Sequence, residues 1–349
     1  MKKVTVNASL TYDVLIEKGI IDRAGELCRG VSSPCRAVIV TDTNVAPLYL
    51  DRVQASLGKS GFEAISFTIE AGEQSKCAES YLALLSFMAS NRITRSDVIV
   101  ALGGGVVGDL AGFAAATYLR GIKFFQIPTT LLAMVDSSVG GKTAIDIPEG
   151  KNLVGAFYQP SLVICDPETL STLPRPVFAD GCAEVLKYGI INDKPLWDKL
   201  GQPIEHQLED VIEKCVADKR DIVNEDERDV GVRQLLNLGH TPAHAVEMLS
   251  AFSISHGSAV AMGMAIMARA AAKMGLCPDS DCKEIIDRIA SYGLPTGCPF
   301  SASELASIAL NDKKRGGKSI SVILPHGIGN SQIHKISVDE LEKIFSLGL

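Results

Sequence analysis

Residues 98–109 read VIVALGGGVVGD, so a short apolar run rich in β-branched residues passes directly into a glycine-rich turn. The apolar, alanine-rich segment that follows, at 110–118, predicts a helix. A strand, a glycine turn and a helix in this order can bind a pyrophosphate, because glycines let the backbone approach and a helix N-terminus favours negative charge. Gly103, Gly105 and Gly108 also fit the GxGxxG pattern. That pattern is weak on its own, and a tight strand-to-helix turn without a ligand explains it equally well.

Strand-like and helix-like segments alternate around this turn and predict an α/β domain built on a parallel sheet. Residues 36–41 and 97–101 are β-branched runs, and residues 75–90 have the spacing of an amphipathic helix that crosses between two strands. The glycine turn begins at residue 103, whereas the usual dinucleotide fold has it in the first strand–helix unit. We therefore expect a Rossmann-like variant.

Beyond residue 160 the pattern becomes mostly helical, and only residues 319–324 are clearly typical of a strand. The predicted helices span 179–191, 203–224, 241–250, 256–274 and 282–292. Proline and glycine punctuate the chain between 150 and 160 without a long polar linker. We therefore predict two domains, an α/β domain at 1–158 and a mostly α-helical domain at 159–349. The resemblance described below implies that the first binds NAD and that the second binds a metal and the substrate.

Size, charge and cysteine usage restrict the classes of protein to which the chain can belong. With 349 residues, of which 46% are hydrophobic, it can bury a large core. Its formal net charge of -7 argues against a nucleic-acid surface, which needs basic residues. The N-terminal residues lack the apolar run of an export signal, and no apolar stretch reaches the length of about 20 residues that spans a bilayer. Nine cysteines without a Cys-x-x-Cys spacing indicate reduced thiols, so we expect a cytoplasmic protein with no membrane or nucleic-acid partner.

A histidine cluster lies at residues 236–244, which read LNLGHTPAH, and His256 follows with its own glycine. Imidazole is the commonest protein ligand for catalytic divalent metals and titrates near neutral pH, so the cluster indicates a metal site, a proton relay or both. His240 and His244 are four residues apart and could share one face of a helix. The Thr-Pro pair after His240 is typical of an N-cap and a first helical residue, however, which would leave His240 ahead of the helix. The residues alone do not decide which histidine binds a metal.

Together with four further segments, the glycine turn makes the chain resemble the 3-dehydroquinate synthase family of the sugar-phosphate cyclase superfamily. These segments lie at 128–143, 181–189, 219–233 and 236–257. The resemblance implies an N-terminal NAD-binding domain, a helical domain with one divalent metal, zinc as the usual ion and cobalt as the alternative, and a homodimer. The implied reaction converts 3-deoxy-D-arabino-heptulosonate 7-phosphate to 3-dehydroquinate and phosphate, the second step of the shikimate pathway. It proceeds by transient oxidation with NAD, phosphate elimination, reduction and intramolecular aldol closure.

The resemblance also implies roles for single residues. Glu184, His240 and His256 match the metal ligands, which leaves coordination positions for substrate oxygens, and His244 matches the residue that transfers protons. A lysine is most often a solvated surface residue, but the matching positions of the family face a small anionic sugar phosphate. The implied phosphate contacts are Arg120, Lys142 and Asn152, the implied carboxylate contacts are Arg233 and Lys314, and the residues around the reacting hydroxyls are Asp136, Lys187, Lys219 and Asn237. These last four, with His244 and Lys142, are implied to be catalytic.

Arg120 is expected to reach the site of the neighbouring subunit, and Lys313 and Arg315 are alternatives to Lys314. The positions that match the NAD contacts are Asp42, Asn44, Glu73, Lys76, Gly105, Val106, Val107, Gly108, Asp109, Thr129, Thr130, Lys142, Lys151, Thr169, Leu170, Ser171 and Thr172. Asp42 follows a predicted strand and is suitably placed to accept hydrogen bonds from a ribose or from a nicotinamide amide. A turn residue that caps the next segment is the more ordinary interpretation of the same aspartate.

Three other interpretations stand beside this one. Another sugar-phosphate cyclase would differ in a few pocket residues, and a metal-dependent polyol or glycerol dehydrogenase would release NADH as a product. A catalytically silent NAD-binding protein is the third, and the intact set of ligands and cations disfavours it. The chain departs from the family at residues 175–176 and 242–243, where the changes affect loop geometry more than chemistry.

Overall fold

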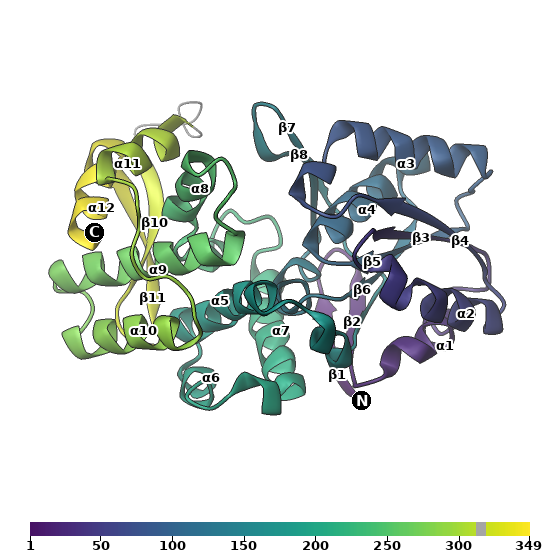
Figure 1. The fold of residues 1–349 in the computed structure, drawn as a ribbon, viewed down its shortest axis with the longest axis horizontal. Helices are drawn as coiled ribbons and strands as arrows, with labels where there is room; N and C mark the ends of the chain where they lie inside the picture. Colours follow the sequence, from purple (N-terminus) through teal and green to yellow (C-terminus); the bar gives the residue numbers. More distant parts are fainter. Residues whose placement is uncertain (312–318) are drawn as a thin grey trace. The chain divides into compact units, whose positions relative to one another are not determined.

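The computed structural model describes residues 1–311 and 319–349, which fold into two compact units (Figure 1). The first unit consists of Met1–Leu173 and Leu208–Asn224. The second consists of Pro174–Gln207 and the described part of Glu225–Leu349. The chain therefore leaves the first unit, returns to it for one helix and leaves it again.

A seven-stranded sheet forms the centre of the first unit, in the order β1-β2-β9-β6-β5-β3-β4. Its strands are β1 (Lys2–Asn7), β2 (Thr11–Ile16), β3 (Arg36–Asp42), β4 (Glu63–Ile69), β5 (Val98–Gly103), β6 (Lys123–Pro128) and β9 (Leu162–Cys165). Neighbouring strands run parallel except for β1 and β2, which pair antiparallel at one edge. The predicted parallel α/β fold is confirmed, with an antiparallel edge strand that makes it a variant of the Rossmann arrangement.

Two apolar cores lie on the two faces of this sheet. In β5, Val98 and Val100 pack into one core and Ile99 packs into the other, because side chains alternate along a strand. The helices of the unit are α1 (Ala24–Arg29), α2 (Asp51–Lys59), α3 (Ala78–Ser90), α4 (Gly105–Thr117) and α7 (Leu208–Glu225). Figure 1 shows α1 and α2 on one side of the sheet and α3 and α4 on the other. Because both faces are covered, the buried strand is a continuous apolar run in the sequence.

Shorter helical segments connect these elements. In the first unit they are η1 (Ile20–Arg23), η2 (Ala46–Leu50), η3 (Glu73–Ser75), η4 (Tyr118–Arg120), η5 (Ala133–Ser137) and η6 (Pro167–Thr172). In the second unit they are η7 (Ile204–His206), η8 (Val232–Asn237) and η9 (Val338–Glu340). The predicted helix at 75–90 thus begins at Ala78, after the separate segment η3.

An antiparallel hairpin, β7 (Lys142–Ile147) and β8 (Gly150–Phe157), occupies most of the stretch that the sequence predicted to join two domains. Gly150 and Gly155 thus belong to β8 rather than to a linker, and Pro160 lies between the hairpin and β9. β9 then pairs with β2 and β6 inside the main sheet, and the first unit runs on to Leu173. The compact units therefore differ from the predicted division between residues 158 and 159.

Helix α7 also lies in the first unit, although its sequence falls in the predicted helical domain. Lys2 Nζ contacts Glu213 Oε2 at 2.6 Å, and the backbone N–H of Asn7 donates to Asn224 Oδ1 at 2.9 Å. These contacts attach α7 to the first strand of the sheet. A helical pattern shows that a segment is amphipathic but not which core its apolar face joins. The position of α7 in the chain therefore did not reveal the unit to which it belongs.

The second unit is mostly helical, as predicted. Its helices are α5 (Arg175–Ile191), α6 (Lys194–Lys199), α8 (His240–Leu249), α9 (His256–Lys273), α10 (Asp279–Ser291), α11 (Ala302–Asn311) and α12 (Leu341–Gly348). The predicted strand at 319–324 is β10 (Ser319–Pro325), which pairs with β11 (Ser331–Ser337). β11 was not predicted, because most of its residues are exposed or half-buried and it carries few apolar residues.

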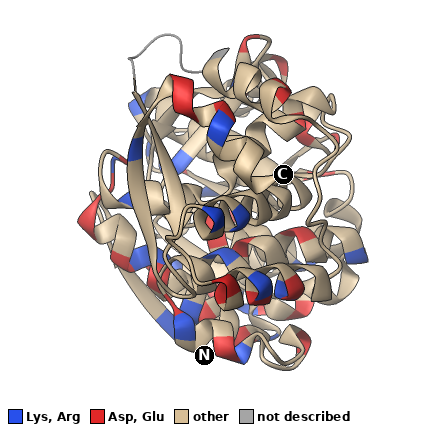
Figure 2. Ribbon diagram, turned by 90° about the vertical axis from the view of Figure 1, so that its left-hand side faces the viewer, with Lys and Arg blue, Asp and Glu red and all other residues tan. Residues whose placement is uncertain are grey.

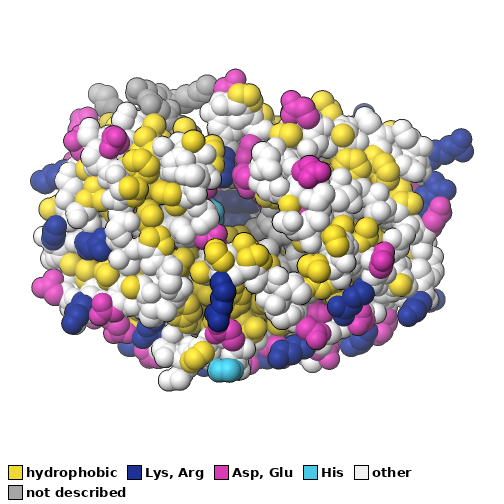
Figure 3. Space-filling model, in the orientation of Figure 1, with side chains coloured by type: hydrophobic (Ala, Val, Ile, Leu, Met, Phe, Trp, Pro, Cys, Tyr) yellow, Lys and Arg dark blue, Asp and Glu magenta, His cyan; other side chains and the backbone are white. Residues whose placement is uncertain are grey.

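Helix α9, rich in Ala, Gly and Met, confirms the helix predicted at 256–274 and is buried along most of its length. No helix within the described residues is both long and apolar enough to cross a membrane. On the faces drawn in Figures 2 and 3, acidic and basic residues are interspersed rather than gathered by sign.

Candidate functional site

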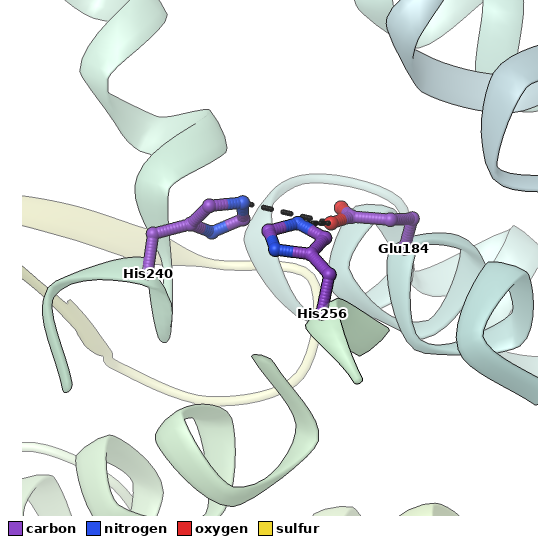
Figure 4. Close-up of side chains that lie close together, drawn as sticks. All are labelled: Glu184, His240 and His256. Carbon is purple, nitrogen blue, oxygen red and sulfur yellow. Dashed lines mark ion pairs between the residues drawn. The ribbon is translucent and has the colours of Figure 1, made fainter. Parts of the chain in front are cut away.

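Three side chains of the second unit converge with their donor atoms toward one point (Figure 4). Glu184 comes from α5, and His240 and His256 are the first residues of α8 and α9. Glu184 Oε1 lies 3.5 Å from His240 Nε2 and 3.4 Å from His256 Nε2. Two ligands of a tetrahedral metal, each at about 2.0–2.1 Å from it, are about 3.3–3.4 Å apart. This group of two imidazoles and one carboxylate therefore fits a divalent metal ion.

Glycines bring the three helices close enough for this convergence. A Cβ on Gly257 would lie 2.2 Å from Cα of Asp180 in α5, and a Cβ on Gly263 would lie 2.0 Å from the carbonyl oxygen of Gly239. Gly239 also has a φ of 79°, in the left-handed region that favours glycine. Larger residues at these positions would force α5, α8 and α9 apart and separate the donors.

The electrostatics of the group favour a bound cation. Glu184 and Lys187 are each 1% exposed, and Lys187 Nζ lies 2.5 Å from Glu184 Oε2. Burial alone would raise the pKa of Glu184, but Lys187 and His240 hold it well below its usual range. Burial lowers the pKa of His256, yet Glu184 and a second carboxylate, Glu247, raise it to about 10. Glu184 therefore stays ionised, which is the form of a carboxylate that binds a metal ion, and a metal bound at His256 would replace the proton on that ring.

The start of α8 differs from the sequence prediction. The helix begins at His240 with Gly239 as its N-cap, so Thr241 and Pro242 are the second and third helical residues. His240 is thus part of the helix and does not precede it, and the predicted Thr241 cap is wrong. A Thr-Pro pair signals a helix start only to within a residue or two, and the left-handed glycine decides the boundary here.

A cavity of about 410 Å³ opens beside His240. Its lining residues are Asp229, Gln234, Asn237, His240, Thr241, His244, Ala245, Met248, Ile308, Ala309, Ser321 and Ile323. His244 is exposed one turn after His240, and their ring centroids are 5.9 Å apart. Among the described residues the converging donors are Glu184, His240 and His256, and His244 is outside that group. It lines the cavity instead, as does Asn237.

Sequence reasoning missed Asp229, which lines the same cavity. Its φ of 60° is in the left-handed region, which is uncommon for a residue with a side chain and is often found at functional sites. The cluster of acidic residues at 225–229 was a signal in the sequence, but such a cluster is also typical of a solvated turn.

The glycine turn of the first unit has the predicted structure. β5 ends at Gly103, Gly104 is the N-cap, and α4 begins at Gly105. A Cβ on Gly103 would lie 2.7 Å from Cγ2 of Val107, and a Cβ on Gly108 would lie 2.9 Å from Gln126 Oε1. The glycines therefore allow the helix to start close to the strand, which leaves its N-terminal amides available to an anion.

A buried lysine gathers several of the predicted residues near this turn. Lys76 Nζ lies 2.9 Å from Glu73 Oε1 and 3.3 Å from Asp109 Oδ2, and it donates to Asn152 Oδ1 at 2.8 Å. Lys151 Nζ also contacts Glu73, at 3.3 Å. Burial raises the pKa of Asp109 to about 6, although Lys76 acts in the opposite direction.

Asp146, which the sequence did not single out, belongs to the same cluster. Its Oδ1 lies 3.7 Å from Lys76 Nζ and accepts a hydrogen bond from the backbone N–H of Asn152 at 2.8 Å. Asn152 has a φ of 56°, so this bond supports an uncommon backbone conformation at a predicted phosphate contact. A lone aspartate between two apolar residues in a strand carries little signal in a sequence.

Comparison with known proteins identifies the family. The model of the 3-dehydroquinate synthase N-terminal domain matches residues 66–180, and that of the C-terminal domain matches residues 181–315. The chain belongs to the 3-dehydroquinate synthase family. The 3-dehydroquinate synthase of Streptococcus suis (strain 05ZYH33) is 44% identical over 350 aligned positions, which cover 97% of this chain and 98% of the relative. That of Streptococcus sanguinis (strain SK36) is 46% identical over 341 positions, which cover 95% and 96%.

A solved structure with a related fold is the 2-epi-5-epi-valiolone synthase ValA from Streptomyces hygroscopicus subsp. jinggangensis 5008, with NAD⁺ and Zn²⁺ bound. It is 28% identical to this chain, with a TM-score of 0.88 and 98% of each chain covered. The two-unit fold of this 3-dehydroquinate synthase family member is thus shared with another sugar-phosphate cyclase.

The remaining residues matched to the 3-dehydroquinate synthase family have varied surroundings. Lys219 of α7 lies 3.0 Å from Asp136 Oδ1 and donates to the Asp136 carbonyl at 2.7 Å, so the structure brings this predicted pair together. Arg233 is 1% exposed, and its Nη1 donates to the Glu227 carbonyl at 2.6 Å. Lys314, like Lys313 and Arg315, lies outside the described residues.

Two cations matched to the phosphate contacts lie beside backbone in the left-handed region. Arg120 itself has a φ of 70°. Lys142 is exposed at the start of β7 and follows Gly140 and Gly141, whose φ values are 95° and 70°. Glycine is needed at 141 for a second reason, because a Cβ there would lie 2.7 Å from Gln159.

Several NAD-matched residues have structural partners in the first unit. Asp42 Oδ1 accepts from the N–H of Asn44 at 2.8 Å and of Val45 at 2.9 Å, which is the turn-capping arrangement weighed from the sequence. Tyr49, which was not predicted, contacts η6: its hydroxyl lies 2.7 Å from Thr172 Oγ1 and donates to the Thr169 carbonyl at 3.2 Å. Leu170 and Ser171 lie in the same segment, Val106 and Val107 lie in the first turn of α4, and Thr129 and Thr130 follow β6.

Proposed function

We propose that this chain catalyses the conversion of 3-deoxy-D-arabino-heptulosonate 7-phosphate to 3-dehydroquinate and phosphate, with one divalent metal ion and NAD. The observation that carries the proposal is the convergence of Glu184, His240 and His256 beside a cavity that His244 and Asn237 also line. Membership of the 3-dehydroquinate synthase family supports the choice of substrate. The reaction is the second step of the shikimate pathway.

The residues present fit the two cofactors that the reaction needs, a divalent metal ion and NAD. Glu184, His240 and His256 would hold the metal ion, zinc by preference and cobalt as the alternative, because their donor separations of 3.4 and 3.5 Å suit tetrahedral ligands. The turn from Gly103 into α4 would receive the pyrophosphate of NAD, because its glycines leave the helix N-terminus accessible. When bound, the metal supplies a Lewis acid and NAD supplies a hydride acceptor that is restored within the same turnover.

The substrate carries a phosphate and a carboxylate, and cations of this acidic chain are proposed to meet both. Lys142, Arg120 and Asn152 bind the phosphate, while Arg233 and Lys314 bind the carboxylate. Lys187, Lys219, Asp136 and Asn237 surround the reacting hydroxyls. The ion pairs that Lys187 and Lys219 make with carboxylates support this role, because they hold each ammonium group at a fixed place.

His244 is proposed to move protons. It lies on the exposed side of α8, one turn after His240, and it is not among the converging donors. An imidazole titrates near neutral pH, so it can accept and return a proton in one turnover.

The decisive experiment incubates the purified protein with the heptulosonate phosphate, NAD⁺ and zinc, and measures phosphate and 3-dehydroquinate together. We expect equal amounts of the two products and no net NADH. Accumulation of NADH without phosphate release would refute the proposal in favour of a dehydrogenase. The matched variant His256→Ala should lose both its zinc and its turnover, and full zinc loading with normal turnover would remove His256 from the ligand set.

We further propose that the enzyme is a homodimer in which Arg120 serves the site of the neighbouring subunit. The left-handed φ of 70° at Arg120 supports a functional role, because such strain tends to persist where function requires it. Inactive Arg120→Ala and His244→Ala proteins are mixed, unfolded and refolded together. If Arg120 acts across the dimer, about a quarter of the wild-type rate returns, because half of the dimers are mixed and each of these has one intact site. No recovery, with mixed dimers present, would place Arg120 in its own subunit's site.

We also propose a cytoplasmic location. All nine cysteines are free in the structure, which supports a reducing compartment. Fractionation of cells that express the native protein would test this, and recovery outside the cytoplasmic fraction would contradict it.

A further inference from the structure

Glu247 is a buried carboxylate beside the three converging donors that has no role in the proposals above. It lies on α8 and is 3% exposed. Its Oε1 is 3.4 Å from Nδ1 of His256. Nε2 of the same ring faces Glu184 (Figure 4) and lies 3.4 Å from Glu184 Oε1. The two nitrogens of His256 therefore face two different carboxylates.

The position of Glu247 follows from the helix on which it lies. Glu247 is seven residues after His240, and residues seven apart lie on nearly the same face of a helix. A single face of α8 therefore carries one converging imidazole at its start and this carboxylate two turns later.

Glu247 also makes hydrogen bonds with the connection between α8 and α9. Its backbone carbonyl accepts from the N–H of Phe252 at 2.8 Å and from Ser250 Oγ at 3.1 Å. Ala251 and Phe252 have φ values of 49° and 61°, so this short connection holds two consecutive residues in the left-handed region. Such a backbone conformation persists only where the surrounding structure holds it in place. Here it reverses the direction of the chain between α8 and α9, so that His256 faces Glu247.

We propose that Glu247 is a positioning residue that accepts the Nδ1–H of His256 and thereby fixes the tautomer whose Nε2 binds the metal ion. This inference rests on the proposed function, because it presupposes that His256 is a ligand. A histidine ligand needs one nitrogen free for the metal, and the hydrogen bond of the other nitrogen sets which one it is. Glu184 cannot do this for His256, since it faces Nε2.

The test compares the zinc affinity of the full-length wild-type protein with those of Glu247→Gln and Glu247→Met, by competition with a coloured chelator. Loss of a partner that orients a ligand typically weakens metal binding about 10–100-fold, and we expect Glu247→Met to do so. Gln retains an acceptor oxygen without the charge, so we expect a smaller loss for Glu247→Gln. The visible absorption bands of the cobalt-loaded protein should also change in Glu247→Met, because they report the arrangement of the ligands.

A control separates this role from a general effect of removing a buried carboxylate. Asp193 is 4% exposed in the same unit and accepts from the N–H of Leu196 at the start of α6. Asp193→Asn should leave the zinc affinity and the cobalt bands unchanged, whatever its effect on the urea midpoint.

Wild-type zinc affinity in both Glu247 variants would overturn the positioning role. If Glu247→Met does not fold, Glu247→Gln still decides, because an affinity equal to that of the wild type together with unchanged cobalt bands would refute the role. A different result would count against the proposed function itself. If the His256→Ala variant binds as much zinc per subunit as the wild type, His256 is not a metal ligand and the proposed metal site is wrong.

Discussion

Replacement of Gly257 by alanine should damage both the stability and the metal affinity of this protein. The new Cβ would lie 2.2 Å from Cα and 2.4 Å from the carbonyl oxygen of Asp180. An ordinary contact starts at 3.4 Å, so the start of α9 or the facing turn of α5 must move by roughly 1 Å. Backbone atoms cannot rotate out of the way as a side chain can, and overpacking of this kind costs about 1–3 kcal/mol.

The same displacement reaches the converging donors. His256 is the neighbour of Gly257, and Glu184 lies one turn after Asp180 on α5. A shift of about 1 Å is half of a zinc–nitrogen distance of about 2.0–2.1 Å. Gly257→Ala should therefore bind zinc at least 10-fold more weakly, by analogy with the loss of an orienting partner.

Urea unfolding and chelator competition measure the two effects. Gly58→Ala is the matched control, because Gly58 is also helical, in α2, and a Cβ there has nothing within 4 Å. Alanine is favoured over glycine in a helix by about 1 kcal/mol, so the control should be neutral or more stable. If Gly257→Ala equals this control in urea midpoint and retains wild-type zinc affinity, the glycine-dependent packing of α5 and α9 is not what aligns the donors.

Three further predictions concern other parts of the chain. Lys219→Ala removes the ammonium group that contacts the carboxylate and the carbonyl of Asp136, which should lower the free energy of unfolding by about 1–3 kcal/mol in urea titrations. His244→Ala should retain its zinc and lose about 10²–10⁴-fold in turnover, and loss of zinc would make His244 a ligand. Burial raises the pKa of Asp109 to about 6, so its protonated form is favoured in the folded state and the stability that it contributes is lost as pH rises through 6. Relative to Asp109→Asn, the wild type should therefore gain thermal stability as pH falls from 7 to 4. A difference in melting temperature between the two proteins that stays constant over that pH range would contradict this prediction.

The parts of the fold and site that the sequence predicted are those with a local pattern. The run from Val98 to Asp109 determines a strand, a turn and a helix start within twelve residues, and the structure has each of them. The grouping of Glu184, His240 and His256 came from the family resemblance, and the structure brings their donors together. Spacing alone would have favoured His240 with His244.

The missed features depend on contacts between residues that are distant in the sequence. Asp146 is recognisable only because the hairpin turns back so that it faces Asn152 and Lys76. Nothing in the sequence around Glu247 indicates a role for it, because its contact with His256 forms only when α8 and α9 pack together. The boundary of the first unit was missed for the same reason, since α7 belongs to that unit through contacts with residues near the N-terminus.

The assignment of α7 to the first unit has a consequence for synthesis on the ribosome. β1 is the first strand to be made, whereas the helix that contacts it is the last segment of its unit to emerge. The residues made in between, Pro174–Gln207, belong to the other unit and cannot complete it until the C-terminal segments follow. At translation rates of about 5–20 residues per second, the nascent chain spends a few seconds with a nearly finished sheet that still lacks α7. Neither unit can therefore fold to completion from one uninterrupted stretch of the growing chain.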